Sequence, residues 1–269
     1  MRTFGEQEFF SAFERCGVLP GDSILVHSAL FNLGLLEGST PRTLSGDIYK
    51  LILSYIGKGG SVFFPTFFYE YARLGMPYDT KTSMPSKGLG PLVRYAVFQP
   101  GTLRSLNPIF NVSGIGPQAE FVCRGATASA FGHGSPWDRM EEANVKVIGL
   151  GAPFVDSCTC LMCVEQRAGS PHMYNKVYLT PIYEDGRPLN ALVTACVRYL
   201  DFEIQHNFKK MAKRAEETGV LASTPLGMGK VVAFSVPEIY ALGLKCLAVD
   251  PYFFLAKRPE FRTGEIPLK

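Results

Sequence analysis

The chain has 269 residues, 46% of them hydrophobic, and a formal net charge of +3 at pH 7. This length and apolar content can bury one large core, so we expect a single domain over residues 1–269. The mild charge and the lack of a long Lys/Arg run argue against nucleic acid as a partner. No stretch approaches the roughly 20 apolar residues of a membrane span, and the first residues lack the apolar run of a signal peptide, so we expect a cytoplasmic protein with no membrane partner.

The N-terminal segment predicts a helix followed by a buried strand. Thr3 and Glu6 stand at capping-box spacing ahead of apolar residues on a helical period, and Gly17 is placed to end the helix. Residues 23–27 form a short apolar run rich in strand-forming side chains, which predicts a strand that leads into a loop.

The rest of the chain continues this alternation. Ser39-Thr40-Pro41 predicts the start of a helix with proline at its first position, and Gly57 its end. Further helices are expected at residues 92–98 and 159–167 and from Pro237 onward, and strands at residues 61–65, 145–150, 177–183, 192–199 and 230–234. Strands separated by helices indicate a layered α/β fold around a central sheet.

Seven cysteines, an odd number, indicate reduced thiols rather than a disulfide framework. Three of them cluster as Cys158-Thr-Cys160-Leu-Met-Cys163, and the simplest interpretation is apolar packing. A zinc site with His172 is a second interpretation, but on one continuous helix the three thiols cannot converge on a tetrahedral ion, so we expect no metal. A third is that a thiol such as Cys163 accepts the acyl group, activated by Glu165 or His172.

Several short motifs say more about the identity of the chain than its composition and periodicity do. In chain order they are Gly21-Asp22-Ser-Ile-Leu-Val-His27-Ser28-Ala-Leu30 with Gly34, Pro65-Thr66-Phe67, Tyr78-Asp79, Pro85-Ser86-Lys87 with Gly90, Arg104-Ser105-Leu-Asn107-Pro108 with Gly116, Phe131-Gly132-His133-Gly134-Ser135-Pro136, Leu150-Gly151, and Thr159-Cys-Leu-Met162-Cys-Val-Glu165 with Pro171 and Lys176. In this order they make the chain resemble the aminoglycoside 3-N-acetyltransferase family, also called the antibiotic N-acetyltransferases, over nearly its whole length.

The resemblance implies a three-layer α/β/α sandwich around a central mixed sheet, and acetyl-CoA or another acyl-CoA as co-substrate. Ser28, Ala29 and Leu30 would then hold the CoA pyrophosphate at the carboxyl edge of the sheet, with His27 close to the cofactor. Thr66 and Ser113 would line the pantetheine channel. The competing interpretation is that Ser28 caps the next element and Thr66 fills a turn.

The chain departs from the family where the family keeps histidines. The family's base is the histidine of a Thr-x-x-His-x-x-Glu stretch, which here reads Thr159, Met162 and Glu165. The family's His-Pro-x-His stretch begins here with Asn107 and ends with Phe110. Because a thioether cannot take a proton, either the site has been rebuilt for a different substrate or catalysis has been lost.

Glu165 is the first candidate for the chemistry. Beside Met162 it would be partly desolvated, which would raise its pKa toward the range of a general base; the alternative is an exposed helix glutamate. His172, just beyond this helix, is the histidine best placed to replace a lost one. His133 lies on a loop where it could contact substrate, and His206 looks like a surface helix residue.

Members of the family bind cationic amino sugars through acidic side chains, here Asp79, Asp138 and Glu165. The expected acceptor site comprises Tyr69, Asp79, Asn107, His133, Asp138 and Met162. We expect an N-acyltransferase that acts on an amino sugar or another small amine in a biosynthetic pathway, as a monomer or homodimer. The first alternative is a catalytically silent relative that binds a metabolite or partner, and the second is acyl transfer or hydrolysis through a cysteine.

Overall fold

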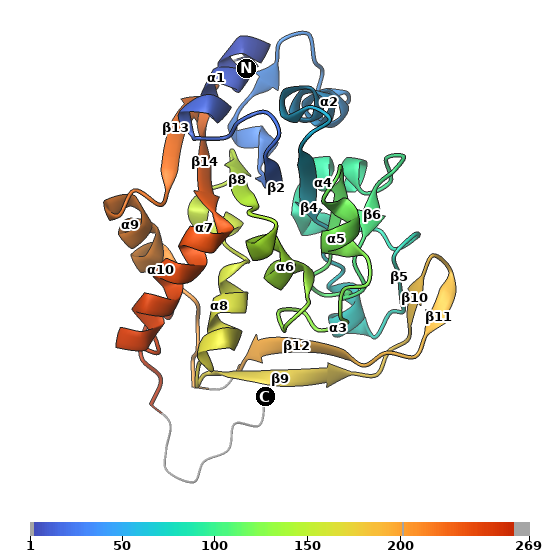
Figure 1. Ribbon diagram of the computed structural model, residues 1–269, viewed down its shortest axis with the longest axis vertical. Coiled ribbons are helices and arrows are strands. Elements are labelled where there is room, and N and C mark those ends of the chain that lie inside the picture. Colours follow the sequence, from blue (N-terminus) through green and yellow to red (C-terminus); the bar gives the residue numbers. More distant parts are fainter. Residues whose placement is uncertain (1–2, 201, 261–269) are drawn as a thin grey trace.

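The computed structural model describes residues 3–200 and 202–260. Its centre is a seven-stranded sheet, which Figure 1 shows from one face. In spatial order its strands are β13 (Ala222–Leu226), β14 (Gly229–Ser235), β8 (Lys146–Leu150), β2 (Ser23–Ser28), β4 (Ser61–Pro65), β7 (Val112–Ile115) and β6 (Leu103–Arg104). β2 is parallel to β4 and β8, whereas the outer strands pair antiparallel. The predicted mixed sheet is confirmed.

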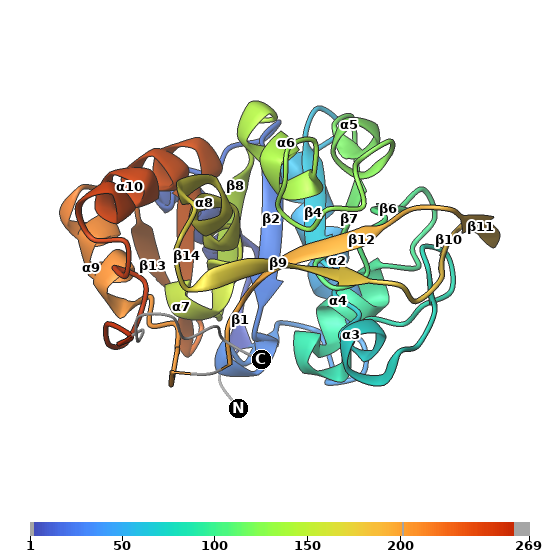
Figure 2. The ribbon, with the colours of Figure 1, turned by 90° about the horizontal axis from the view of Figure 1, so that it is seen from below.

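Helices cover both faces of this sheet because its central strands are apolar on both sides. In β2, Ile24 and Val26 pack into one core and Leu25 into the other. The first core is closed by α1 (Glu6–Arg15), α2 (Leu44–Ile56) and α4 (Gly90–Ala96). The second is closed by α5 (Ala119–Cys123), α6 (Pro136–Glu142), α8 (Leu161–Ala168), α9 (Lys209–Glu217) and α10 (Val236–Val249). Figure 2 shows the sheet between its helical layers, and the predicted three-layer sandwich is confirmed.

A long hairpin lies outside the sheet. Its strands β9 (Met173–Tyr178) and β12 (Val193–Arg198) pair antiparallel and run across the lower side of the molecule beside α8 (Figures 1 and 2). The remaining elements are short: β1 (Thr3–Phe4), β3 (Leu35–Leu36), β5 (Tyr78–Asp79), β10 (Ile182–Glu184), β11 (Arg187–Leu189), α3 (Glu70–Leu74), α7 (Phe154–Ser157), and the 3₁₀ turns η1 (Leu30–Asn32) and η2 (Lys87–Leu89).

Two predicted helix starts are wrong. Thr3 belongs to β1, and the residue that precedes α1 is Gly5, which has no side chain to cap it, so the capping box does not form. α2 begins at Leu44 rather than at Pro41, because Thr40 and Thr43 bond to each other in a turn. Gly57 ends α2 as predicted, with φ of +71°.

The predicted strand at residues 177–183 is interrupted. β9 ends at Tyr178 and β10 begins at Ile182, and Pro181 between them has no amide hydrogen for a ladder. Across residues 3–200 and 202–260, no helix has the length and apolar character to cross a membrane. One domain over residues 1–269 stays a prediction.

Candidate active site

A cavity of about 360 Å³ lies at the carboxyl ends of β2 and β4. His27 and Ser28 end β2, Ala29 follows them, and Pro65 ends β4 on the same wall. Asp156 of α7 also lines it. Open α/β sheets place ligands at the carboxyl ends of their strands. Three of the predicted cofactor residues therefore lie together at a cavity of the expected kind.

Two polar atoms of this wall lack a partner. Nε2 of His27 and Oγ of Ser28 are buried, and neither atom forms a hydrogen bond with any described residue. Burial lowers the pKa of His27 to about 4, so its ring is neutral at pH 7. Because buried polar atoms are costly without partners, the wall suits a ligand that carries amide or phosphate groups, as acyl-CoA does.

The other predicted cofactor residues are less available. The Ala29 amide donates to a carbonyl of β8 at 2.9 Å, so it is not free to bind a pyrophosphate. The Thr66 hydroxyl is buried and donates to Oδ1 of Asn111 at 2.5 Å. Leu30 packs into the core. Ser113 is buried, and its Oγ has no partner within the described residues.

A second group of side chains meets around Glu165 on α8. Nε2 of His172 lies 2.8 Å from Oε1 of Glu165, and Nε2 of His206 lies 3.0 Å from Oε2. The Glu165 and His172 side chains are fully buried, whereas that of His206 is 18% exposed. We call these three residues the Glu165 cluster. It joins two predicted catalytic residues, Glu165 and His172, to one that was not predicted.

The electrostatics of the Glu165 cluster correct one prediction. Burial raises the pKa of Glu165, but hydrogen bonds from His172 and His206 outweigh it and leave the pKa below its ordinary value. The expectation of a raised pKa beside Met162 is therefore wrong, because it omitted the two imidazoles. An ionised carboxylate with a lowered pKa is a poor general base, but it can orient an imidazole and stabilise its cation.

His206 is not the surface helix residue that its charged neighbours indicated. It precedes α9, forms a β-bridge with Leu255 and stacks its ring on Phe208, with centroids 5.3 Å apart. That prediction is wrong because contacts distant in sequence, to Leu255 and Glu165, fix the side chain. No local pattern around His206 could have shown them.

The three clustered cysteines are core residues. They do not share one helix, since α7 ends at Ser157 and α8 begins at Leu161. Sγ of Cys163 lies 3.4 Å from a backbone carbonyl, and burial raises the pKa of Cys163 to about 11. Burial also raises the pKa of Cys158 and Cys160. Thiols with raised pKa values supply no thiolate, which argues against Cys163 as a nucleophile.

The acidic residues expected to bind a cationic acceptor are already engaged. Oδ1 of Asp138 lies 2.7 Å from the Arg167 guanidinium, and its Oδ2 lies 3.2 Å from Nδ1 of the exposed His133. Asp79 accepts the amide of Lys81 at 2.7 Å. Asp138 therefore already has a cationic partner, whereas Asp79 is held by a backbone amide.

The remaining predicted acceptor residues differ in availability. Asn107 is buried, and its side chain donates to two backbone carbonyls and accepts from two backbone amides at 2.8–3.0 Å. Asn107 therefore holds its loop and has no capacity left for a substrate. Tyr69 and Met162 are partly buried against the core, and Met162 lies about one helical turn before Glu165.

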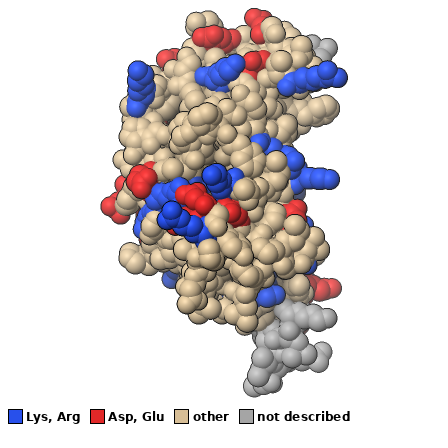
Figure 3. Space-filling model, turned by 90° about the vertical axis from the view of Figure 1, so that its right-hand side faces the viewer, with Lys and Arg blue, Asp and Glu red and all other residues tan. Residues whose placement is uncertain are grey.

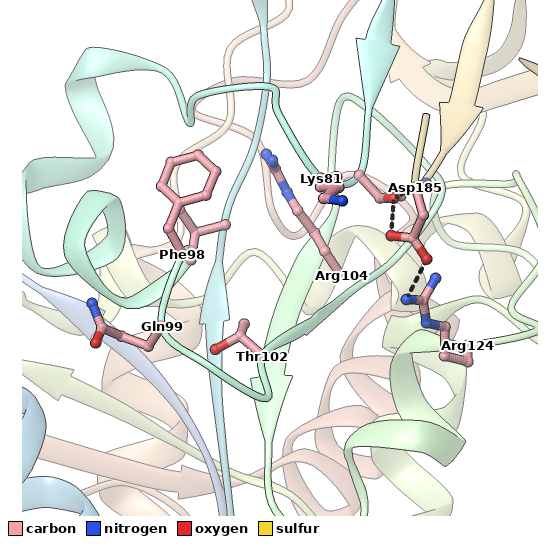
Figure 4. Close-up of a pocket in the computed structure, with 9 residues that line it drawn as sticks. Lys81, Phe98, Gln99, Thr102, Arg104, Arg124 and Asp185 are labelled. Atoms are coloured by element: carbon pink, nitrogen blue, oxygen red, sulfur yellow. Dashed lines mark hydrogen bonds and ion pairs between the residues drawn. The ribbon is translucent and has the colours of Figure 1, made fainter. Parts of the chain in front are cut away.

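A larger cavity of about 550 Å³ lies beside β5, β6 and β10 (Figure 4). Arg124 points at Asp185, with 2.8 Å between Nη2 and Oδ2, and also pairs with Glu184. Arg104 is almost fully buried and makes no ion pair with any carboxylate of the described residues. Figure 3 views this side of the molecule, where basic and acidic side chains gather. With Lys81 also in its wall, this cavity suits an anionic group better than a cationic one.

Comparison with known proteins gives the chain its family. Residues 25–248 match the family model described as aminoglycoside 3-N-acetyltransferase, which is most of the chain. The chain belongs to this family. An aminoglycoside N(3)-acetyltransferase III from Serratia marcescens is 31% identical over 183 residues, which cover 64% of this chain and 68% of the relative. One from Enterobacter cloacae is 28% identical over 187 residues, covering 64% of this chain and 63% of the relative.

Solved structures of aminoglycoside 3-N-acetyltransferases share the fold. AAC(3)-Xa superposes with a TM-score of 0.78 at 18% identity, with 94% of both chains covered. An AAC-IIIb enzyme in a binary complex with CoASH gives a TM-score of 0.77 at 22% identity, covering 96% of this chain and 100% of the other. The predicted family and fold class are confirmed, as are an acyl-CoA-dependent N-acyltransferase as enzyme class and acetyl-CoA as co-substrate.

Proposed function

We propose that this chain transfers the acetyl group of acetyl-CoA to the amine of an amino sugar. The observation that carries the proposal is the Glu165 cluster. Glu165 stands where the family keeps a glutamate, and although Met162 replaces the family's histidine, the buried carboxylate still bonds to imidazole rings at 2.8 and 3.0 Å. A carboxylate paired with an imidazole can supply the base that acyl transfer to an amine uses.

His27 and Ser28 would hold the thioester carrier. Both residues line the cavity at the end of β2, together with Asp156 of α7, and their Nε2 and Oγ atoms have no hydrogen-bond partner among the described residues. The chain continues from α7 into α8, and Asp156 and Glu165 both contribute to the raised pKa of Cys158, whose largest cause is burial. Asp156 on α7 and Glu165 on α8 thus stand on consecutive helices, with Cys158 between them in the chain.

We further propose that the acceptor is a small biosynthetic intermediate with one reactive amine. Asp79 and Asp138 already accept hydrogen bonds, and Asp138 also pairs with Arg167. The larger cavity is bordered by Lys81, Arg104, Arg124 and Asp185, and because Arg124 is paired with Asp185 and Glu184, its positive charge comes from Lys81 and Arg104. Such surroundings favour a neutral or anionic acceptor over a polycationic antibiotic.

The test measures binding and turnover separately. Calorimetry with CoA and acetyl-CoA measures binding, and CoA release against a panel of amino sugars and aminoglycosides measures turnover. We expect CoA binding, and turnover with small amino sugars above that with aminoglycosides. The replacement of the family histidine by Met162 favours a second candidate, a silent binding module, for which CoA or a sugar would bind without turnover. No binding of CoA would contradict the acetyltransferase, and no binding of CoA or of any sugar would contradict both.

A further inference from the structure

The Glu165 carboxylate is held by two imidazoles and by no Lys or Arg of the described residues. Within residues 3–200 and 202–260, the ion pairs of Glu165 are with His172 and His206, and no Lys or Arg approaches it. Its lowered pKa keeps it charged, although burial opposes this. A buried carboxylate without a fixed cation needs protons on its neighbours, so the two imidazoles must each present an N–H to it.

The two imidazoles differ in what their other nitrogen can do. The Nε2 of His172 faces Glu165, and its Nδ1 is buried without a hydrogen-bond partner among the described residues. An unpartnered buried nitrogen is least costly as a bare lone pair, which makes His172 a neutral Nε2–H tautomer. Because its Nδ1 is closed off from solvent, His172 orients the carboxylate and exchanges no proton with a substrate.

His206 has the opposite character. Its Nε2 also faces Glu165, but its side chain is 18% exposed, whereas that of His172 is fully buried. An imidazole that donates one N–H to a carboxylate presents its second nitrogen as a base. We infer that His206, through Nδ1, is the proton acceptor that replaces the histidine lost at Met162, an inference that rests on the proposed function.

The same three side chains could be considered a metal site, since their ligand atoms lie within 4.8 Å of one another. Metal-binding imidazoles almost always donate their second N–H to an acceptor that fixes the ring. Nδ1 of His172 has no such acceptor among the described residues. The hydrogen-bond distances of 2.8 and 3.0 Å are those of imidazole N–H groups on a carboxylate. We therefore favour the proton relay.

The step balances with these groups alone. The amine nitrogen forms a bond to the thioester carbonyl carbon as the carbon–sulfur bond breaks. The amine proton moves to Nδ1 of His206, whose positive charge is stabilised by Glu165, and then to the departing thiolate. The products are the amide and the free thiol, and His206 returns to its neutral form.

The experiment compares His206→Gln with His172→Gln and with Lys209→Gln, an exposed neighbour, by CoA release, CoA calorimetry and thermal unfolding. We expect His206→Gln to lower kcat by about 10²- to 10⁴-fold, with CoA affinity close to wild type and a smaller drop in unfolding midpoint than His172→Gln, because His206 is the more exposed of the two. His172→Gln should lower both the unfolding midpoint and kcat, because it removes an imidazole that bonds to the buried Glu165 carboxylate. Lys209→Gln should resemble wild type.

The outcomes separate the inference from the proposed function. An active wild type with an equally active His206→Gln overturns the role of His206 and leaves the acyltransferase standing. A wild type that turns over no acceptor overturns the function itself. Metal analysis of the purified wild type should find no stoichiometric ion, and an ion lost in His206→Gln would make the cluster a metal site and overturn the inference.

Discussion

Nε2 of His206 lies 3.0 Å from Oε2 of Glu165, although the two residues are 41 positions apart in the chain. The glutamate stands on a helix and the histidine on a loop that precedes α9. The family places its histidine one turn before the glutamate on the same helix, where this chain has Met162. The imidazole thus reaches the carboxylate from another segment of the fold.

Glu165→Gln should lower kcat more than CoA affinity, because a neutral amide cannot stabilise a protonated imidazole. The expected loss is about 10²-fold or more. Steady-state kinetics and calorimetry on the same preparation measure both quantities. A matched loss of CoA binding would instead indicate that Glu165 only maintains the fold. Glu165→Asp, which keeps the charge, should recover part of the activity.

Glu165→Gln should also change how the stability of the protein depends on pH. The pKa of Glu165 is lowered in the folded protein by His172 and His206 against the effect of burial. Its contribution to stability is therefore present above the unfolded-state pKa and is lost as pH falls through the folded-state pKa. Unfolding midpoints of wild type and Glu165→Gln should converge as the pH is lowered. A gap that widens in acid would contradict this.

His27 should also weaken the fold in acid. Burial lowers its pKa from 6.5 to about 4, so the unfolded chain binds a proton that the folded chain does not. Stability should fall as pH drops from about 6.5 toward 4, by up to about 3 kcal/mol. His27→Gln should flatten this part of the pH profile in denaturant unfolding. An unchanged slope would mean that the ring is protonated in the folded state.

Arg104 should matter for stability. Its guanidinium donates to Oδ1 of Asn111 at 2.8 Å, to the Thr66 carbonyl at 2.6 Å and to the Ser83 carbonyl. Arg104→Met would remove three hydrogen bonds from a charged donor and leave the buried Thr66 carbonyl without this partner, at a cost of about 3 kcal/mol in the free energy of unfolding. Urea unfolding measures this loss in the free energy of unfolding, and Arg187→Met, at an exposed position, is the control. Equal stability of both variants would refute this role.

Cys163→Ser should keep turnover. Burial holds its thiol protonated with a pKa near 11, and its Sγ faces a backbone carbonyl. Intact mass after incubation with acetyl-CoA should show no acetyl adduct. An adduct that disappears in Cys163→Ser would restore the nucleophile hypothesis.

Much of the fold could be predicted because its signals are local. The run at residues 61–65 became β4 with the same bounds, and the apolar run of β2 was predicted to within one residue. Boundaries that depend on competing side-chain bonds were missed, as at Thr40 and Thr43, where a turn precedes α2. The hairpin of β9 and β12 was predicted as two strands, but local patterns did not place it outside the sheet.

The site could be predicted only where a motif carried it. His27 and Ser28 were expected at the sheet edge because a strand ends there, and Glu165 because it follows Thr159 at a fixed spacing. His172 was expected near Glu165 because it follows the same helix, whereas His206 reaches the carboxylate from the segment before α9, 41 positions away, and no local pattern relates the two. Asp138 was expected to bind substrate because it is acidic, and its ion pair with Arg167, 29 positions away, could not be read from the sequence.

The most direct measurement of the central claim is a rescue. In His206→Gln, the further change Met162→His places an imidazole one turn before Glu165, where the family has it. The double variant should recover at least about tenfold of the kcat that His206→Gln loses, with CoA affinity unchanged. A double variant that folds and binds CoA but is as inactive as His206→Gln would contradict the claim that His206 replaces the missing histidine.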